Sequence, residues 1–284
     1  VSTVLDTVDA LVAVFDTGID LTNPEFTNNL WKNPGEIPNN GIDDDHNGFV
    51  DDEYGWNFVD GNNNVQDTSL TNHGTLVSGV IGAQGNNGQG ISGVAWNMDL
   101  LTVKVGTDTG VTSQDLIAGS NYVIALKQRG VNIVAINASY ISFALPTLDE
   151  LNAIKSAGDV GISYVAAAGN SGLNFDSILP SGFVPSNMIL VAATDNRDQL
   201  ASFSDYGKNS VALGAPGVDI LSTLRSGLFG VFSGTSFAAP MVSGAIALIK
   251  SYIPGATMDQ VKNAILYDGD PDPSLAGKTI TGKR

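Results

Sequence analysis

The chain alternates short apolar segments with longer helical ones, and this alternation constrains its fold more than any other feature. The short segments are rich in β-branched residues and predict buried strands at residues 11–15, 100–105, 131–137, 162–168 and 188–193. The longer segments predict helices at residues 75–83, 113–129, 147–157, 237–252 and 258–267. Strands that alternate with helices form a parallel sheet that is covered on both faces. We therefore predict an α/β fold, a three-layer sandwich with a mostly parallel central sheet flanked by helices.

Length and charge limit the organisation and the partners of the chain. Its 284 residues, 43% of them hydrophobic, are enough for one full core, and no repeat or long linker divides them. We predict a single domain over residues 1–284 and a monomer. A net charge of −16 repels phosphate, so we expect neither nucleic acid nor a membrane as a partner. No apolar run reaches the roughly 18–20 residues that span a bilayer.

Cysteine is absent, which excludes a thiol nucleophile, a thiolate metal site and a disulfide framework. Residues 1–10 lack the basic start and the apolar core of a signal peptide. If the protein is exported, we expect these residues to follow a leader that has been removed.

Polar residues gather where the predicted strands end, which is where parallel sheets bind their ligands. Asp16 follows the first predicted strand, Ser139 lies just beyond the third, and Asn170 lies just beyond the fourth. His73 and Ser236 each stand just before a helical segment. The sequence therefore predicts that chemistry takes place at this edge of the sheet.

Three of these residues have the chemistry of a nucleophile, a general base and a carboxylate that orients the base. The chain holds only two histidines, and because His46 lies in an aspartate-rich loop, His73 is the candidate base. Ser236 precedes an apolar helix whose N–H groups and dipole stabilise negative charge. We expect Pro240 in the first turn of that helix, where its missing N–H is not needed. Asp16 would orient His73.

Each of the three residues also has an ordinary structural interpretation. Ser236 could be a helix cap, His73 a surface histidine and Asp16 a turn residue. Taken together they favour catalysis, because all three have glycine neighbours at one sheet edge. They also follow the chain order Asp, His, Ser, which is the order known for subtilisin.

The motifs around these residues resemble those of the subtilases, the peptidases of the subtilisin family. Residues 12–20 (VAVFDTGID) are similar to the aspartate motif, 73–79 (HGTLVSG) to the histidine motif and 234–240 (GTSFAAP) to the serine motif. Further matches occur at residues 167–170 (AAGN), 200–204 (LASFS) and 215–217 (APG). The resemblance covers nearly the whole chain.

The resemblance implies a secreted, extracellular serine endopeptidase that cleaves proteins or peptides through an acyl-enzyme. Ser236 would attack the scissile carbonyl, His73 would transfer the proton, and Asp16 would orient the imidazole. Asn170 would donate a side-chain N–H to the oxyanion, beside the backbone N–H of Ser236. Such enzymes are made as zymogens with an inhibitory N-terminal propeptide. This chain lacks that segment, so we interpret it as a mature catalytic domain.

The family also implies a substrate groove. The strand that ends at Ser139 and Tyr140 would pair with the substrate backbone. One wall of the pocket for the side chain before the cut (P1) would be formed by three small residues, Ala167, Ala168 and Gly169. Because small residues leave that pocket open, we expect an apolar or aromatic P1. Ile141, where glycine is common, would narrow the rim, and Ile178 falls near the expected floor.

Three loops rich in oxygen ligands predict one to three structural calcium ions. The first loop begins like an EF-hand but lacks the final glutamate; its expected ligands are Asp43, Asp45, Asn47, the carbonyl of Phe49 and Asp52. The second resembles a calcium loop of thermophilic subtilases and comprises Asn57, Asp60, Asn62, Asn64 and Gln66. The third, residues 84–90, stands in the place of the family's tight calcium loop and offers Asn86 or Asn87. A solvated acidic loop is the alternative for the first, but its closely spaced aspartates would repel one another without a counter-ion.

Two other classes of protein compete with a peptidase. An inactive subtilase-like domain could bind peptides, but the complete triad and Asn170 argue against it. An esterase of the α/β-hydrolase type would need a Gly-x-Ser-x-Gly motif and the order Ser, acid, His, and neither occurs at Ser236.

Overall fold

A seven-stranded parallel sheet forms the centre of the protein. The structure is a computed structural model that describes residues 10–140, 146–178 and 183–284. The strand order is β2-β3-β1-β6-β7-β8-β9, and every neighbouring pair is parallel. The strands are β1 (Leu11–Asp16), β2 (Gly55–Asn57), β3 (Asp99–Lys104), β6 (Ile133–Ala138), β7 (Ser163–Ala167), β8 (Met188–Thr194) and β9 (Leu213–Pro216). Two short antiparallel pairs lie outside this sheet, namely β4 (Gly106–Thr107) with β5 (Gly110–Val111), and β10 (Ile220–Thr223) with β11 (Phe229–Phe232).

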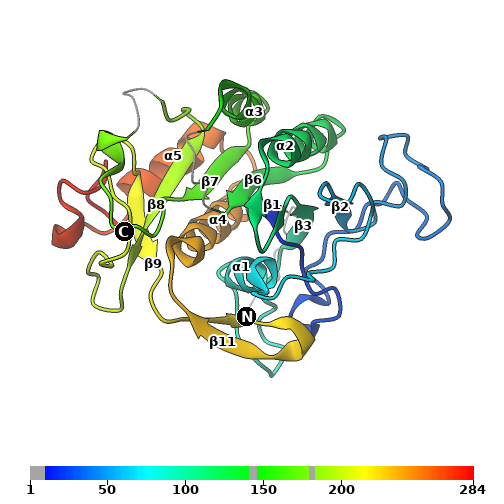
Figure 1. Cartoon of the computed structure of the whole chain (residues 1–284), viewed down its shortest axis with the longest axis horizontal. Helices are drawn as coiled ribbons and strands as arrows, with labels where there is room; N and C mark the ends of the chain where they lie inside the picture. The colour runs from blue at the N-terminus through cyan, green and yellow to red at the C-terminus, as the bar shows by residue number, and fades with distance from the viewer. Residues whose placement is uncertain (1–9, 141–145, 179–182) are drawn as a thin grey trace.

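Helices cover both faces of the sheet (Figure 1). They are α1 (His73–Gly82), α2 (Ser113–Gln128), α3 (Leu148–Asp159), α4 (Thr235–Tyr252) and α5 (Met258–Tyr267). Val12 and Val14 of β1 pack in the hydrophobic cluster on the side of α1, α4 and α5. The alternate residues Leu11, Ala13 and Phe15 pack in the cluster on the side of α2 and α3. The predicted three-layer α/β sandwich is confirmed.

All of the predicted strands and helices are present, with ends that differ by a few residues. The sequence did not predict β2 and β9, the two edge strands of the sheet. Strand β2 is only three residues long, and β9 contains Gly214 and Pro216, which are unusual inside strands. Short or glycine-containing edge strands give too weak a pattern to be recognised.

Helix α4 begins earlier than predicted, and this changes the role of Pro240. The helix starts at Thr235, so the proline lies beyond its first turn, and the prediction that placed it there was wrong. A proline has no N–H for the carbonyl four residues before it, which here belongs to Ser236. The hydroxyl of Ser139 donates to that carbonyl instead, at 2.9 Å. Pro240 therefore allows a side chain near the end of β6 to bind the start of α4.

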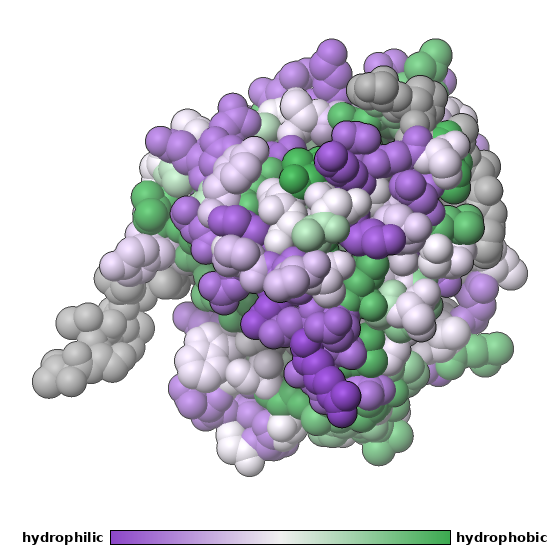
Figure 2. Space-filling model, turned by 90° about the vertical axis from the view of Figure 1, so that its left-hand side faces the viewer, coloured by the Kyte–Doolittle hydropathy of each residue, from purple (hydrophilic) through white to green (hydrophobic). Residues whose placement is uncertain are grey.

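Figure 2 shows the side of the molecule that carries β9 and the C-terminus, where polar residues are spread between smaller apolar groups. Across the described residues, none of the helices combines the length and apolar character required to cross a membrane.

Candidate active site and cation loops

The ends of strands and the starts of helices bring the predicted catalytic residues to one edge of the sheet. Asp16 is the last residue of β1, and Asn170 follows β7. His73 opens α1, while Ser236 is the second residue of α4. Helix α1 packs against both β1 and α4, so the elements that carry Asp16, His73 and Ser236 are neighbours.

Asp16 and His73 are directly paired. The Nδ1 atom of His73 lies 2.9 Å from Asp16 Oδ1 and 3.0 Å from Asp16 Oδ2. Partial burial lowers the pKa of the imidazole, but the Asp16 carboxylate and, to a smaller extent, Asp67 raise it, so the pKa of His73 lies above its ordinary value. The contact to Asp16 leaves Nε2 to accept a proton, and 28% of the His73 side chain remains exposed. This is the geometry of an oriented general base.

A buried carboxylate, Asp67, holds the start of α1. It accepts hydrogen bonds from Thr17 Oγ1, from N and Oγ of Ser69, and from N and Oγ1 of Thr75. Thr17 Oγ1 also accepts the N–H of Gly74 at 2.9 Å. Asn72, the residue before the helix, gives no side-chain cap, so Thr17 and Asp67 satisfy helix donors in its place. Sequence reasoning missed Asp67, because its partners become neighbours only in the fold.

Ser236 is hydrogen-bonded to the strand that the family resemblance assigns to the substrate groove. Its Oγ donates to the Ser139 carbonyl at 2.7 Å, and Ser139 Oγ donates back to the Ser236 carbonyl. Within residues 10–140, 146–178 and 183–284 no hydrogen bond joins Ser236 to His73. Such a bond is often long in ligand-free sites and shortens only with substrate.

Asn170 has an amide whose orientation is fixed. Its Oδ1 accepts from the N–H of Thr235 at 2.8 Å and from Thr235 Oγ1 at 2.9 Å. Because the oxygen is held in this way, the Nδ2 group is left as the donor toward the reaction centre. A β-carbon on Gly234 would lie 3.5 Å from that nitrogen, so the amide sits beside the loop that leads to Ser236.

The predicted pocket wall lies at the end of β7. Ala167 and Ala168 are buried, and Gly169 follows with a φ of +121°. Tyr140 is partly buried, and its hydroxyl lies 2.5 Å from that of Tyr164. Ile141 lies outside the described residues. Ile178 is 41% exposed after the short turn Phe175–Ser177, and its place at the pocket floor stays a prediction.

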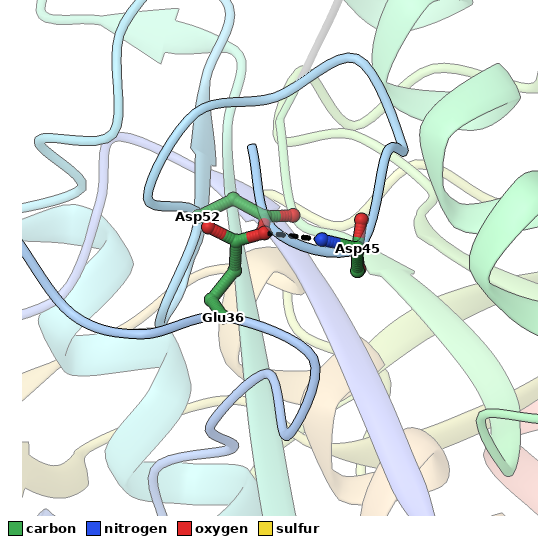
Figure 3. Close-up of side chains that lie close together, drawn as sticks. All are labelled: Glu36, Asp45 and Asp52. Carbon is green, nitrogen blue, oxygen red and sulfur yellow. Dashed lines mark hydrogen bonds between the residues drawn. The ribbon is translucent and has the colours of Figure 1, made fainter. Parts of the chain in front are cut away.

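At the first cation loop, Glu36, which precedes the loop, lies close to Asp45 and Asp52 and accepts the backbone N–H of Asp45 at 3.2 Å (Figure 3). One carboxylate oxygen from each of Glu36, Asp45 and Asp52 lies within 4.8 Å of the others. The side-chain amide of Asn33 donates to Asp45 at 3.0 Å and to Asp52 at 2.7 Å, and Asn47 donates to the same pair. Burial is the largest cause that raises the pKa of Asp52 to about 6, and Asp45 adds to the rise.

The predicted ligands of this loop are not all in that cluster. Asp45, Asn47 and Asp52 come together, whereas the Asp43 carboxylate accepts backbone N–H groups of the loop itself. The ring of Phe49 packs edge-on against Tyr122, with centroids 4.7 Å apart. Glu36 was missed, because it precedes the loop in sequence.

In the second loop, oxygens surround one amide nitrogen. Asn57 Nδ2 donates to Asp60 Oδ2 at 2.9 Å and to the Asn64 carbonyl at 3.0 Å, and it lies 3.5 Å from Asn62 Oδ1. Gln66 instead contacts a different segment, since its Nε2 donates to Asp20 Oδ1 at 3.2 Å.

The third loop contacts a buried glutamate that sequence reasoning missed. Glu25 has no exposed surface, and burial raises its pKa. Its Oε1 accepts from Asn87 Nδ2 at 3.4 Å, whereas Oε2 has no hydrogen-bond partner in the described structure. A buried carboxylate oxygen without a donor is costly unless a cation or a proton satisfies it.

Comparison with known proteins agrees with this geometry. The model of the subtilase family matches residues 8–270. A thermophilic serine proteinase of Bacillus sp. (strain AK1) is 34% identical over 259 residues, 91% of this chain and 56% of that protein. The major intracellular serine protease of Bacillus subtilis (strain 168) is 36% identical over 249 residues, 85% of this chain and 68% of that protein.

A solved structure extends the similarity to three dimensions. The crystal structure of a cold-adapted subtilisin-like serine proteinase superposes with a TM-score of 0.73 and 26% sequence identity, covering 96% of this chain and 87% of that one. The family match, the sequence relatives and this common fold agree with one another, and the chain belongs to the subtilase family.

Proposed function

We propose that this chain is the catalytic part of a serine endopeptidase, with Ser236 as nucleophile, His73 as general base and Asp16 as the carboxylate that orients His73. The observation that carries this proposal is the Asp16–His73 pair at the sheet edge where Ser236 and Asn170 also lie. The names of the two Bacillus relatives, both serine proteases, support the same reaction class.

The proposed reaction begins when a substrate backbone enters the groove beside Ser139. Ser236 Oγ leaves the Ser139 carbonyl, transfers its proton to His73 Nε2 and attacks the scissile carbonyl carbon. Asp16 stabilises the imidazolium that forms, in agreement with the raised pKa of His73. His73 then donates the proton to the leaving amine, and a water that it deprotonates hydrolyses the acyl-enzyme.

Negative charge on the carbonyl oxygen would be stabilised by two donors. These are Asn170 Nδ2, which the two bonds from Thr235 to Oδ1 leave as a donor, and the backbone N–H of Ser236 at the start of α4. In subtilisin itself, loss of the corresponding asparagine lowers turnover by about 10²–10³.

Replacing the nucleophile tests the proposal. Ser236→Ala removes the only atom that can form the acyl-enzyme, so we expect hydrolysis of a denatured protein to fall by about 10⁶-fold, the loss known for subtilisin's serine. A serine-directed reagent should block the native chain, whereas a thiol reagent should not. Substantial cleavage by purified Ser236→Ala, at a melting temperature equal to that of the parent, would sink the assignment.

The same digest tests substrate preference. We propose that P1 is apolar or aromatic, because Ala167, Ala168 and Gly169 offer little bulk at the wall where that side chain would bind. Mass-spectrometric mapping of the cleavage sites should show Phe, Tyr, Leu or Met before the cut more often than Lys, Arg, Asp or Glu. An excess of charged P1 residues would contradict the proposal.

We further propose that calcium binds the loops as a structural ion. Two observations support the fit: the unpartnered Oε2 of buried Glu25 beside Asn87, and the three closely spaced carboxylates of Glu36, Asp45 and Asp52. Carboxylate, amide and carbonyl oxygens are the ligands that Ca²⁺ takes. Asp60, Asn62 and the carbonyl of Asn64 could hold an ion more weakly, because only one of them is charged. When bound, calcium supplies positive charge that ties these loops together.

Calcium dependence of this kind suits an enzyme that acts outside the cell. Extracellular calcium modules bind with dissociation constants of about 10⁻⁴–10⁻³ M. We propose export on this ground, although one of the relatives is named as an intracellular protease. Fractionation of the source cells tests the proposal, and activity found only in the cytosol would refute it.

A further inference from the structure

The loop that carries Asn170 is held against a second segment of the chain, residues 203–206. Gly172 N–H donates to the Phe203 carbonyl at 2.7 Å, and Tyr206 N–H donates to the Leu173 carbonyl at 3.0 Å. Asp205 N–H donates to the carbonyl of Gly169 at 2.9 Å. The backbone around Asn170 is therefore fixed by residues that lie more than thirty positions later in the chain.

The side chain of Asp205 reaches into the turn of this loop. It is 4% exposed, and its Oδ1 accepts N–H groups from Ser171 at 3.0 Å and from Leu173 at 2.7 Å. Hydrogen bonds to an ionised carboxylate are roughly twice as strong as neutral ones. These two bonds place the backbone directly after Asn170.

The other carboxylate oxygen packs on the residue before Asn170. Gly169 has a φ of +121°, and a β-carbon there would come within 2.1 Å of Asp205 Oδ2. Only glycine fits this approach. Asp205 thus contacts the chain on both sides of Asn170, at Gly169 and at the N–H of Ser171.

Besides these backbone bonds, two side chains therefore help to define where the Asn170 amide lies. Thr235 sets the orientation of the side chain, and Asp205 sets the position of the backbone that bears it. We propose that Asp205 is a positioning residue for the oxyanion donor Asn170. This inference rests on the proposed role of Asn170 and adds the group through which the fold places that donor. A misplacement of about 1 Å in a catalytic group can cost about 10² in rate.

A double-mutant cycle tests the inference, with kcat measured on a peptide ester or amide. Asp205→Ala should lower kcat about tenfold and change KM less, since a misplaced donor weakens transition-state binding. In the Asn170→Ala background the same change should lower kcat less than about twofold, because the donor it positions is gone. Asp205→Asn keeps an oxygen acceptor and should lower kcat by only about threefold.

Asp195→Ala is the matched control. Its Oδ1 also accepts two backbone N–H groups, from Arg197 and Gln199 at 2.9 Å each, but in the loop after β8. It should leave kcat unchanged in both backgrounds. If Asp205→Ala does not fold, the cycle is run with Asp205→Asn, whose smaller loss, about threefold, must also vanish without Asn170.

The outcomes separate this inference from the function on which it rests. If Asn170→Ala lowers kcat but Asp205→Ala does not, or lowers it equally in both backgrounds, Asp205 does not act through Asn170 and the inference is overturned. If Asn170→Ala itself leaves kcat unchanged, the proposed oxyanion role fails, and the positioning role fails with it.

Discussion

Two buried aspartates, Asp67 at the catalytic edge and Asp52 in the first cation loop, have no exposed surface, yet their surroundings differ. Asp67 accepts five hydrogen bonds, from Thr17, from Ser69 and from Thr75 in the first turn of α1. Asp52 accepts three and lies close to two further carboxylates, Asp45 and Glu36. Its pKa rises to about 6.

This difference separates a carboxylate that the protein's own donors satisfy from one that the proposed calcium ion would satisfy. Around Asp67 the fold supplies enough donors, so this group can act on His73 at any calcium concentration. Around Asp52 the fold places two further carboxylates, and although Arg129 pairs with Asp45 at 3.3 Å, a proton or a cation would stabilise Asp52 itself. Changes at Asp67 should therefore affect kcat/KM and its pH profile. Changes at Asp52 should affect how much calcium raises the melting temperature.

At these two aspartates, the largest effect on catalysis should come from Asp67→Asn. Loss of its charge weakens the hold on α1, and we expect kcat/KM to fall about tenfold. Because the negative charge of Asp67 favours the imidazolium, removing it lowers the pKa of His73. The base form then persists to lower pH, so the acidic limb of the kcat/KM profile should shift to lower pH.

Asp52→Asn is the control for this profile. It should leave the acidic limb where the parent has it, because Asp52 does not contribute to the raised pKa of His73. If Asp67→Asn did not shift the acidic limb, or if Asp52→Asn shifted it equally far, Asp67 would have no special effect on His73.

Removal of calcium should have the largest effect on stability. An ion held at 100 times its dissociation constant stabilises the folded state by about 2.7 kcal/mol. For a chain of 284 residues that is a melting-temperature difference of roughly 4–5 °C per site. Calorimetry in calcium and in chelator measures the difference. Equal melting temperatures in the two buffers would show that the protein binds no stabilising calcium ion.

Asp52→Asn should sharpen this result, because its effect should change sign with calcium. Without the ion, the raised pKa of Asp52 gives stability at low pH that is lost as the pH rises through about 6. At pH 7 the amide avoids that loss, so the calcium-free variant should melt no lower than the calcium-free parent. In calcium it should melt lower than the parent, because a charged ligand is missing. A variant that is less stable by the same amount in both buffers would show that Asp52 binds no ion.

The smallest effect concerns oxidation next to the nucleophile. Phe237 directly follows Ser236 in the chain, and its ring lies beside Phe232 and His73 with centroids 6.0 and 6.2 Å away. We expect the parent to keep activity in peroxide, whereas Phe237→Met should lose it faster as a sulfoxide forms next to Ser236. Met241→Leu is the control for the nearby native methionine. Equal rates of loss in the parent and in Phe237→Met would contradict this expectation.

Short motifs in the sequence reveal functional residues only where the signal lies within a few neighbouring residues. Asp16, His73, Ser236 and Asn170 each stand next to the end of a strand or the start of a helix, so short motifs could identify them. Glu25, Asp67 and Asp205 could not be found in that way, because their roles depend on contacts with segments far along the chain.

Pro240 shows that the exact start of a helix is also hard to predict from sequence. Its position in the second turn of α4 depended on a helix start that periodicity placed two residues late. The helix tolerates this proline because the Ser139 hydroxyl, about a hundred positions away in sequence, donates to the Ser236 carbonyl. The hydroxyl that replaces the missing N–H donor belongs to the fold and cannot be seen in the helix sequence.

The most direct test of the central claim is covalent labelling of the native chain with a fluorophosphonate, followed by peptide mapping. We predict one label per chain, on Ser236, formed rapidly in the parent and at a rate reduced by several orders of magnitude in His73→Ala. A label on another residue, or equal rates in the parent and His73→Ala, would contradict the assignment of Ser236 as a nucleophile activated by His73.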